Sequence, residues 1–364
     1  MNFLLSEEQL EIQRTVERLL DEQCPSTTLH QIFDAAPYER PQVDALWQAL
    51  VEMGIPGLAL PEEYGGSELE LIDLALVSEV LGSRAAPTPF FSHSLSSLAI
   101  LWAGSDEQKS RWLPTLASGE HMAAAALGED LGVWEPMQWR LKLEQGHKLT
   151  GAKYHAPDLA QADFIVVGLE GGKLAVVERD APGLTIELEA GHDRTRPLYT
   201  VYFENTPAEP LEDPKGNASK LLHNAASVLI AADAFGGANH CVEMAVDYAK
   251  IREQFGVPIG RFQALKHQLA NMALAVEPSR GLYWFAAHAF DHLPDQAERA
   301  AALAKAHLTD LYLQVARDSV EAHGGIGYTW ECDVQIYLKR AMYDHALFGN
   351  PRQHRERAAQ LAGW

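Results

Sequence analysis

The spacing of apolar residues changes twice along the chain. In 10–20 and 43–50, apolar side chains recur every three to four residues, which predicts amphipathic helices. The first helix should begin after Ser6, because a serine hydroxyl can accept a hydrogen bond from the open first turn. A turn rich in glycine and proline at 54–66 interrupts this pattern. Further helices are predicted over 72–81, 92–102 and 109–116.

The second stretch, from about residue 121 to 213, has a sequence pattern typical of short strands. Its apolar runs are β-branched or alternating, and glycine and proline separate them. Strands are predicted at 166–167, 174–177, 184–188 and 199–203. This pattern is typical of an antiparallel β domain.

Helical spacing returns after residue 217 and is sustained for longer. Helices are predicted over 221–250, 263–290 and 296–323. Long amphipathic helices of this kind form bundles. The sequence therefore predicts an α+β protein with a helical domain at 1–120, an antiparallel β domain at 121–213 and a four-helix bundle at 214–364.

Composition narrows the functional class. The net charge is −21, which excludes a nucleic-acid partner because phosphate contacts need a basic surface. No apolar run reaches the length of about 18 residues that suggests a membrane span, and the acidic N-terminus does not resemble a signal peptide. The three cysteines, Cys24, Cys241 and Cys332, lack metal-ligand spacing, so we expect no metal site and a reducing cytoplasm.

Two segments carry the most specific signal. Residues 252–267, REQFGVPIGRFQALKH, and residues 323–331, HGGIGYTWE, resemble the C-terminal half of the flavin-dependent acyl-CoA dehydrogenases. The motif PEEYGG at 61–66 and the later pieces DEQK at 106–109 and WLP at 112–114 follow in the family's order. The resemblance implies FAD as cofactor, an acyl-CoA thioester as substrate and α,β-dehydrogenation as the reaction.

The resemblance also assigns roles to single residues. Arg252 matches the arginine that reaches the FAD pyrophosphate of a neighbouring subunit, which suits a guanidinium because it offers two forked donors. Gly324 and Gly325 match glycines at which the backbone approaches that FAD. Glu321 stands where the family has glutamine, which is a departure beside a diphosphate. The remaining cofactor positions implied are Phe255, Ile259, Phe262 and Gln263.

The middle of the expected flavin site departs further from the family. The stretch 125–132, AALGEDLG, keeps little of the usual threonine-glutamate-proline and glycine-serine-aspartate pattern. The flavin-stacking tryptophan and the two residues after it correspond here to His155, Ala156 and Pro157. Proline at this place offers neither a backbone N–H nor a hydroxyl.

The reaction needs a carboxylate base to remove the α-proton of the thioester, and neither family position provides one. One position is occupied by Phe348 and the other by Ala226. Asp233 is the nearest acid on the same predicted helix, about 10 Å further along by helix rise. It is a candidate base in a shifted site, or else the structural partner of an arginine or histidine.

The departures resemble a subfamily of bacterial steroid and side-chain degradation, in which two different chains can pair as an α2β2 heterotetramer. The stretches 83–90, 193–196 and 348–355 carry this likeness. Three readings stay open: a base-lacking subunit of a heteromeric dehydrogenase, a self-sufficient homotetramer with an unusual base, and a non-catalytic relative. An electron-transferring flavoprotein is a further possible partner. The basic run Arg352, His354, Arg355 and Arg357 is either a local anion-binding patch or a solvated helix face.

Overall fold

The computed structural model describes residues 4–36 and 40–364. The N-terminal region is helical, as predicted. Ser6 caps the first helix: its hydroxyl accepts a hydrogen bond from the N–H of Gln9, and the Gln9 side chain bonds back to the N–H of Ser6. The helices of this region are α1 (Glu7–Gln23), α2 (Ser26–Asp34), α3 (Pro41–Glu52), α4 (Leu71–Ser83), α5 (Phe90–Ala103) and α6 (Asp106–Ala117).

The middle region holds two four-stranded sheets. One has the order β1-β4-β5-β8, with β1 (Ala123–Ala126), β4 (Phe164–Leu169), β5 (Lys173–Glu178) and β8 (Glu209–Pro210). The other has the order β2-β3-β7-β6, with β2 (Leu143–Glu144), β3 (Lys148–Pro157), β7 (Leu198–Pro207) and β6 (Leu184–Leu188). The expectation of a purely antiparallel domain needs one correction, because β1 runs parallel to β4.

The C-terminal region is a bundle of long helices, as predicted. Its elements are α7 (Ala218–Ile251), the hairpin strands β9 (Glu253–Gln254) and β10 (Val257–Pro258), α8 (Gln263–Val276), α9 (Arg280–His292), α10 (Pro294–His323), α11 (Val334–Ala346) and α12 (Pro351–Leu361). A single helix over 263–290 was the wrong prediction. The turn Glu277–Ser279 divides it, because Pro278 has no N–H to continue the helical hydrogen bonds.

Helix α7 is the centre of the bundle and packs against both α10 and α4. It is long and apolar enough to cross a membrane, but 94% of its most apolar window is buried inside the fold. Its approach to α4 is close: a Cβ on Gly236 would lie 1.9 Å from the backbone oxygen of Glu79, and one on Gly82 would lie 2.1 Å from that of Asp233. Glycine at both positions therefore allows the two helix backbones to touch.

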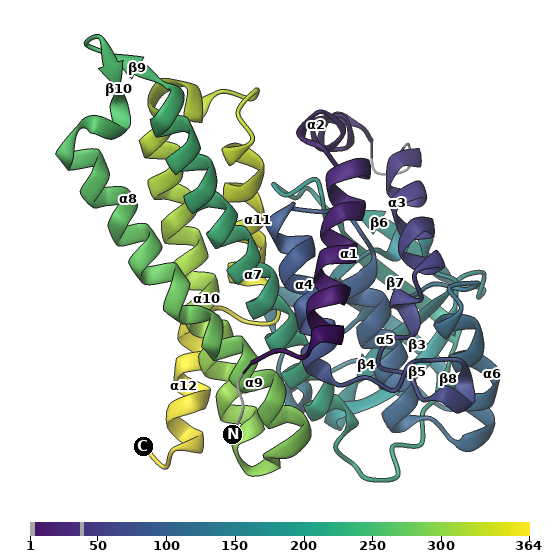
Figure 1. The fold of residues 1–364 in the computed structure, drawn as a ribbon. Helices are drawn as coiled ribbons and strands as arrows, with labels where there is room; N and C mark the ends of the chain where they lie inside the picture. The colour runs from purple at the N-terminus through teal and green to yellow at the C-terminus, as the bar shows by residue number, and fades with distance from the viewer. Residues whose placement is uncertain (1–3, 37–39) are drawn as a thin grey trace.

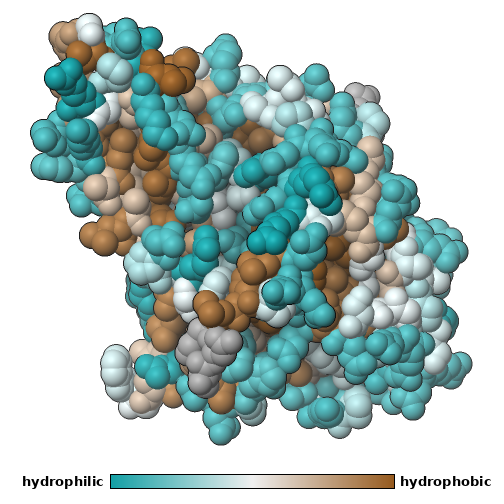
Figure 2. Space-filling model, viewed as in Figure 1, coloured by the Kyte–Doolittle hydropathy of each residue, from teal (hydrophilic) through white to brown (hydrophobic). Residues whose placement is uncertain are grey.

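The three regions follow one another along the chain, and the exact boundaries at 120 and 213 stay predictions. Figure 1 shows α8 and the β9–β10 hairpin projecting from the upper left of the molecule, away from the β strands. Figure 2 shows apolar surface along this projecting part. Phe255 at the hairpin tip is 93% exposed, and Leu274 on α8 is 74% exposed.

Candidate active site

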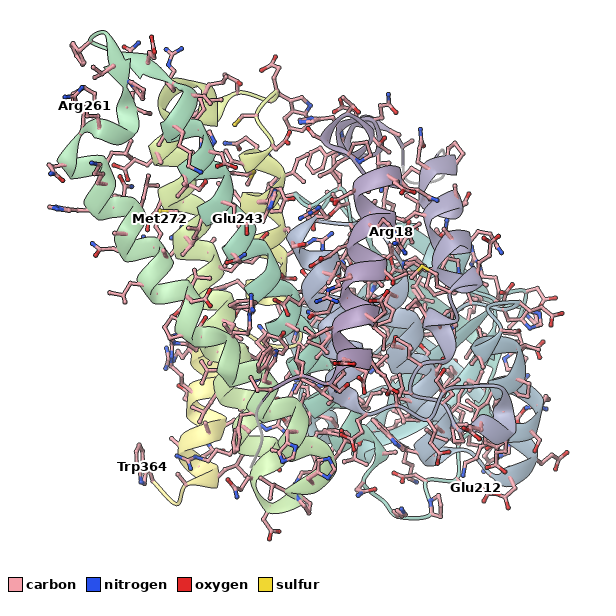
Figure 3. The ribbon with its side chains drawn as sticks, viewed as in Figure 1. Arg18, Glu212, Glu243, Arg261, Met272 and Trp364 are labelled. Carbon is pink, nitrogen blue, oxygen red and sulfur yellow. The ribbon has the colours of Figure 1, made fainter. Side chains whose placement is uncertain are left out.

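The hairpin after α7 presents the first group of predicted cofactor residues. Arg252 ends α7, and its N–H donates to the carbonyl of Tyr248 at 2.8 Å while its side chain is exposed. Phe255 and Gly256 both have positive φ, +54° and +77°, as in a tight hairpin turn. The rings of Phe255 and Phe262 meet edge to face with centroids 6.0 Å apart. Figure 3 places Arg261 on the same projecting end.

Gln263 begins α8 and is exposed, and Ile259 lies half-buried beneath the hairpin.

The second group of predicted cofactor residues lies where α10 ends. Gly324 has φ +65° and ψ −142°, a conformation that is essentially restricted to glycine, and Gly325 follows it with open space around its Cα. Glu321, one turn earlier, is exposed.

The two groups share one end of the bundle. A groove of about 460 Å³ lies between the end of α7 and the turn Gly324–Tyr328, and Tyr248, Ile251, His323 and Ile326 line it. The rings of Tyr248 and His323 stack across it at 4.6 Å. Residues 248–263 and 321–328 together form the bundle end. The structure thus brings the predicted cofactor residues to one exposed place.

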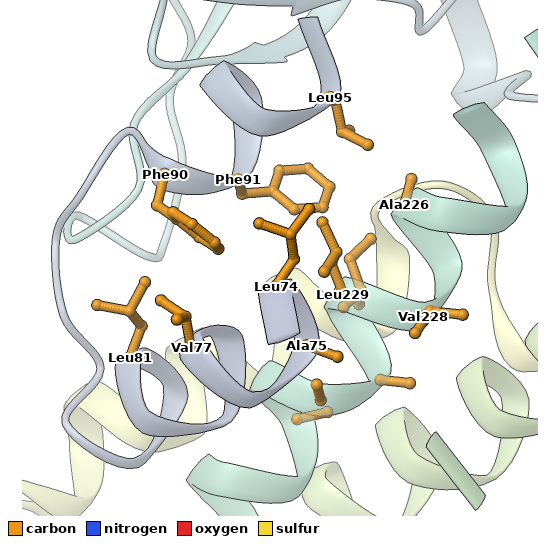
Figure 4. Close-up of a cluster of buried hydrophobic side chains, with 14 of the residues drawn as sticks. Leu74, Ala75, Val77, Leu81, Phe90, Phe91, Leu95, Ala226, Val228 and Leu229 are labelled. Atoms are coloured by element: carbon orange, nitrogen blue, oxygen red, sulfur yellow. The ribbon is translucent and has the colours of Figure 1, made fainter. Parts of the chain in front are cut away.

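The side chains at both base positions are buried. Ala226 is fully buried on α7, and Figure 4 shows it among Leu95, Phe91 and Leu229. Phe348 lies in the turn between α11 and α12, has φ +55° and is 3% exposed. Neither side chain can take up a proton.

The ring of Phe348 is enclosed by other rings. It stacks on Trp134 at a centroid distance of 4.8 Å and an interplanar angle of 20°. It also meets Phe91 edge to face at 5.8 Å and lies 6.1 Å from the ring of His223. Its carbonyl oxygen accepts a hydrogen bond from Nε2 of His354 at 2.9 Å.

Two histidines and an arginine beside Phe348 were not recognised as site residues from the sequence. Burial lowers the pKa of His354 to about 3 and lowers the pKa of His223 well below its ordinary range, so both rings are neutral. Arg357 contacts Nδ1 of His223 and donates to Glu298 at 3.0 Å. In the sequence, the basic run 352–357 was the feature that pointed to two of these residues. In the structure Arg352 and Arg355 are exposed, whereas His354 and Arg357 turn inward.

These groups line a cavity of about 610 Å³ that opens onto Trp134 and Phe348. Glu135 lies at its wall, with Oε2 at 3.9 Å from both Nδ1 of His223 and Nη1 of Arg357. No periodic pattern marks Trp134 or Glu135, because they belong to the irregular connection between β1 and β2.

Asp233 lies elsewhere, in a buried ionic cluster formed by Asp193, Arg196, Asp233, Arg340 and Asp344. Nη2 of Arg196 donates to its Oδ1 at 2.5 Å, and Nη1 of Arg340 lies 3.4 Å from both of its oxygens. Burial alone would raise the pKa of Asp233, but the two guanidinium groups outweigh burial and lower it. A lowered pKa is the opposite of what a base for an α-proton requires, so these contacts favour the structural role.

His155, at the position of the family's flavin-stacking tryptophan, is an ion-pair partner here. Its N–H donates to Oε1 of Glu189 at 2.8 Å, and its Nδ1 lies 2.7 Å from Oε2. The hydrogen bond that His155 donates to the Glu189 carboxylate raises the pKa of His155. The carbonyl of Pro157 accepts from the hydroxyl of Ser92 at 3.2 Å, and the same hydroxyl accepts from the N–H of Ala125 at 3.0 Å.

FAD, the cofactor implied by the resemblance, fits one part of this arrangement and not the other. At the bundle end, Arg252 and Phe255 are exposed, and Gly324 and Gly325 leave the space that a backbone contact needs. Between His155 and Phe348 the ring of Trp134 takes up the room. The exposed bundle end therefore leaves room for a cofactor, and the interior around Trp134 does not.

Comparison with known proteins agrees with this fold. Residues 6–120 match the family model for the acyl-CoA dehydrogenase N-terminal domain, and residues 218–362 match that for the C-terminal domain. Acyl-CoA dehydrogenase IpdE2 of Mycobacterium tuberculosis is 32% identical over 85% of this chain and 84% of its own length. The protein of the same name from Mycolicibacterium smegmatis is 29% identical over 97% and 98%.

Solved structures show the same architecture. A variant described as the Tcur3481-Tcur3483 steroid ACAD has a TM-score of 0.89 and 28% identity, and the match covers 98% of each chain. The two matched domains and the order of helical and β regions therefore agree with the acyl-CoA dehydrogenase fold. The chain belongs to the acyl-CoA dehydrogenase family of FAD-dependent oxidoreductases.

Proposed function

We propose that this chain is the base-lacking subunit of a heteromeric acyl-CoA dehydrogenase. The observation that carries the proposal is the apolar character of both base positions, since Phe348 and Ala226 are buried among rings and aliphatic side chains. The names of similar proteins add support, because IpdE2 is an acyl-CoA dehydrogenase and the Tcur3481-Tcur3483 protein is a steroid ACAD. We infer a bulky acyl-CoA, of lipid or steroid catabolism, as the substrate.

The chemistry explains why a partner is needed. The α-carbon of the thioester loses a proton to a base, and the β-carbon loses a hydride, which leaves a 2,3-double bond. FAD, when bound, supplies the acceptor for the hydride. The α-proton is weakly acidic, so the base must be a carboxylate held in contact with it. Phe348 offers a ring instead, and the neighbouring His354 uses its Nε2–H for the Phe348 carbonyl.

The contribution of this chain to the assembly lies at the bundle end. We propose that Arg252 bonds the pyrophosphate of the partner's FAD, because a guanidinium offers forked donors and its exposure leaves it free to reach outward. Gly324 and Gly325 would let the backbone approach the same cofactor. Phe255, Ile259, Phe262 and Gln263 would cover its edge, and Glu321 would turn away or bond a ribose hydroxyl.

The proposed assembly is a tetramer of two chain types in the cytoplasm, reoxidised by an electron-transferring flavoprotein. Exposed apolar side chains on the projecting part of the bundle support contact with another chain, including Phe255 and Leu274. The net charge of −21 supports the expectation that it binds no nucleic acid. The burial of α7 supports the expectation that it does not enter a membrane.

The test compares this chain alone, a second dehydrogenase-like chain from the same genome alone, and the two co-expressed. Turnover of an acyl-CoA is followed with an artificial electron acceptor. We expect turnover from the co-expressed pair and none from this chain by itself. Turnover by this chain alone would exclude the base-lacking role and favour the self-sufficient homotetramer.

Asp233→Asn and Glu135→Gln then separate the alternatives. If this chain is active alone, loss of turnover with FAD retained identifies which carboxylate is the base. Asp233 is the weaker candidate, because its carboxylate is already paired with Arg196 and Arg340. Absence of flavin and of turnover in every preparation, including the co-expressed pair, would point to the non-catalytic relative.

A further inference from the structure

Trp134 has an unusual place for a residue of an irregular loop. It follows a tight turn in which Leu131 and Gly132 have φ +60° and +69°, and its side chain enters the interior with 6% exposure. Leu131, at the tip of the same turn, is 92% exposed. The loop thus sends one large apolar side chain inward and leaves another in solvent.

The indole ring fills a slot between the β domain and the bundle. On one side its centroid lies 6.3 Å from the ring of His155, and a Cβ on Gly128 would come within 2.8 Å of its edge. On the other side it stacks on Phe348 at 4.8 Å. The ring series continues through His223 to His354, at centroid distances of 6.1 Å and 5.8 Å.

Three observations distinguish this slot from ordinary core. The cavity of about 610 Å³ opens onto it, so a ligand can reach it from solvent. Phe348 is held in a left-handed conformation, and such strain is concentrated at functional sites. Nδ1 of His354 is buried at the far end of the ring series without a hydrogen-bond partner among the described residues.

We propose that Trp134 closes this chain's own ring-binding slot from within. An indole has the thickness of the flat ring system that a slot between His155 and Phe348 would otherwise accept, and it is tethered, so it competes at a high effective concentration. One consequence rests on the proposed function. In a pair formed by this chain and its partner chain, only the partner's ring-binding slot is open.

The direct test uses the isolated chain and riboflavin, a flat flavin without phosphate. Titration is followed by flavin fluorescence. We expect no saturable binding to the wild type and at least tenfold tighter binding to Trp134→Ala, with indole competing for the same space. Trp102→Ala is the matched control, because Trp102 is a partly buried tryptophan that packs on Phe290 outside the slot, and it should gain no binding.

Folding of each variant is checked by circular dichroism and thermal unfolding. Trp134→Leu serves if the alanine variant unfolds, because leucine keeps an apolar side chain while vacating most of the ring's area. A folded Trp134 variant that gains no riboflavin binding overturns the proposal. Equal binding by the wild type overturns it as well.

Flavin content of the co-expressed pair provides an independent measurement. We expect one FAD for each pair of chains, and two FAD for each pair would overturn the closed slot. The outcomes for the two proposals are distinguishable. A wild-type chain that holds FAD alone yet is inactive contradicts the closed slot only, while turnover by this chain alone contradicts the base-lacking role.

Discussion

Nε of Arg340 donates to Oδ2 of Asp193 at 2.7 Å, and the Arg340 side chain has no solvent exposure. The same guanidinium donates from Nη2 to the carbonyls of Ala85 and Ala86 at 3.2 Å and 3.4 Å. The Arg340 side chain on α11 therefore joins the β6–β7 connection to the end of α4. The stretches 83–90 and 193–196, which carry the subfamily likeness, are thus neighbours in space.

Arg340→Ala should destabilise the protein strongly. It would leave the buried Asp193 without its ion-pair partner and Asp233 paired with Arg196 alone among the described residues, and removing one partner of a buried ion pair costs about 3–5 kcal/mol. Arg352→Ala, which removes an exposed arginine paired with Glu356, should change the free energy of unfolding by no more than about 0.5 kcal/mol. Urea unfolding of both variants measures the difference, and equal losses would refute this reading of the cluster.

Asp233→Asn and Asp344→Asn should have opposite effects near neutral pH. Burial, and then the negative charge of Asp233, raises the pKa of Asp344 well above its ordinary value, which favours the protonated carboxyl in the folded protein. A raised folded pKa gives stability that is present at low pH and is lost as pH rises above the unfolded value of about 3.9. Asparagine resembles the protonated acid, so Asp344→Asn should be as stable as wild type at pH 4 and more stable at pH 8.

Asp233 behaves in the opposite sense, because its folded pKa is lowered. Its contribution is present above about pH 4 and is lost as pH falls through the folded value. Asp233→Asn should therefore lose about 3 kcal/mol at pH 7, as expected for a broken buried pair. Free energies of unfolding between about pH 2 and pH 8 test both variants, since the Asp233 contribution is lost below pH 4 and that of Asp344 above it. A less stable Asp344→Asn protein at pH 8 would mean that Asp344 is ionised.

Gly236→Ala should push α4 and α7 apart. The added Cβ would meet the backbone oxygen of Glu79 at 1.9 Å, and backbone cannot rotate away as a side chain can, so we expect a loss of about 1–3 kcal/mol. Gly281→Ala on α9 is the control, since a Cβ there meets nothing within 4 Å and alanine favours a helix by about 0.5–1 kcal/mol. Thermal unfolding should rank Gly281→Ala above wild type and Gly236→Ala below it.

Arg252→Ala should weaken FAD binding to the co-expressed pair without destabilising this chain. Losing a charge-assisted hydrogen bond to phosphate costs about 1.5–3 kcal/mol, or roughly 10- to 150-fold in affinity. Arg261→Ala makes the same charge change on the same exposed end and should have a smaller effect. FAD retention during dialysis measures both, and matching losses would reduce the role of Arg252 to general electrostatics.

The local pattern of the sequence was sufficient for much of the fold. Hydrophobic period and capping predicted α1 after Ser6, the strand-rich middle and the long helices α7 and α10, because these depend on neighbours within a few residues. The break at Pro278 was also a local signal, and the prediction of one helix over 263–290 missed it. The parallel pairing of β1 with β4 was not local, since it joins Ala123 to Phe164.

The sequence by itself determined that both base positions are apolar and that Asp233 needs a partner if it is buried. It could not determine the partners, because Arg196 and Arg340 lie 37 and 107 residues away along the chain. Nor could it determine that Trp134 lies on Phe348, more than 200 residues later. Loop residues follow no period, and only the packing of the β domain on the bundle decides which ring fills the slot.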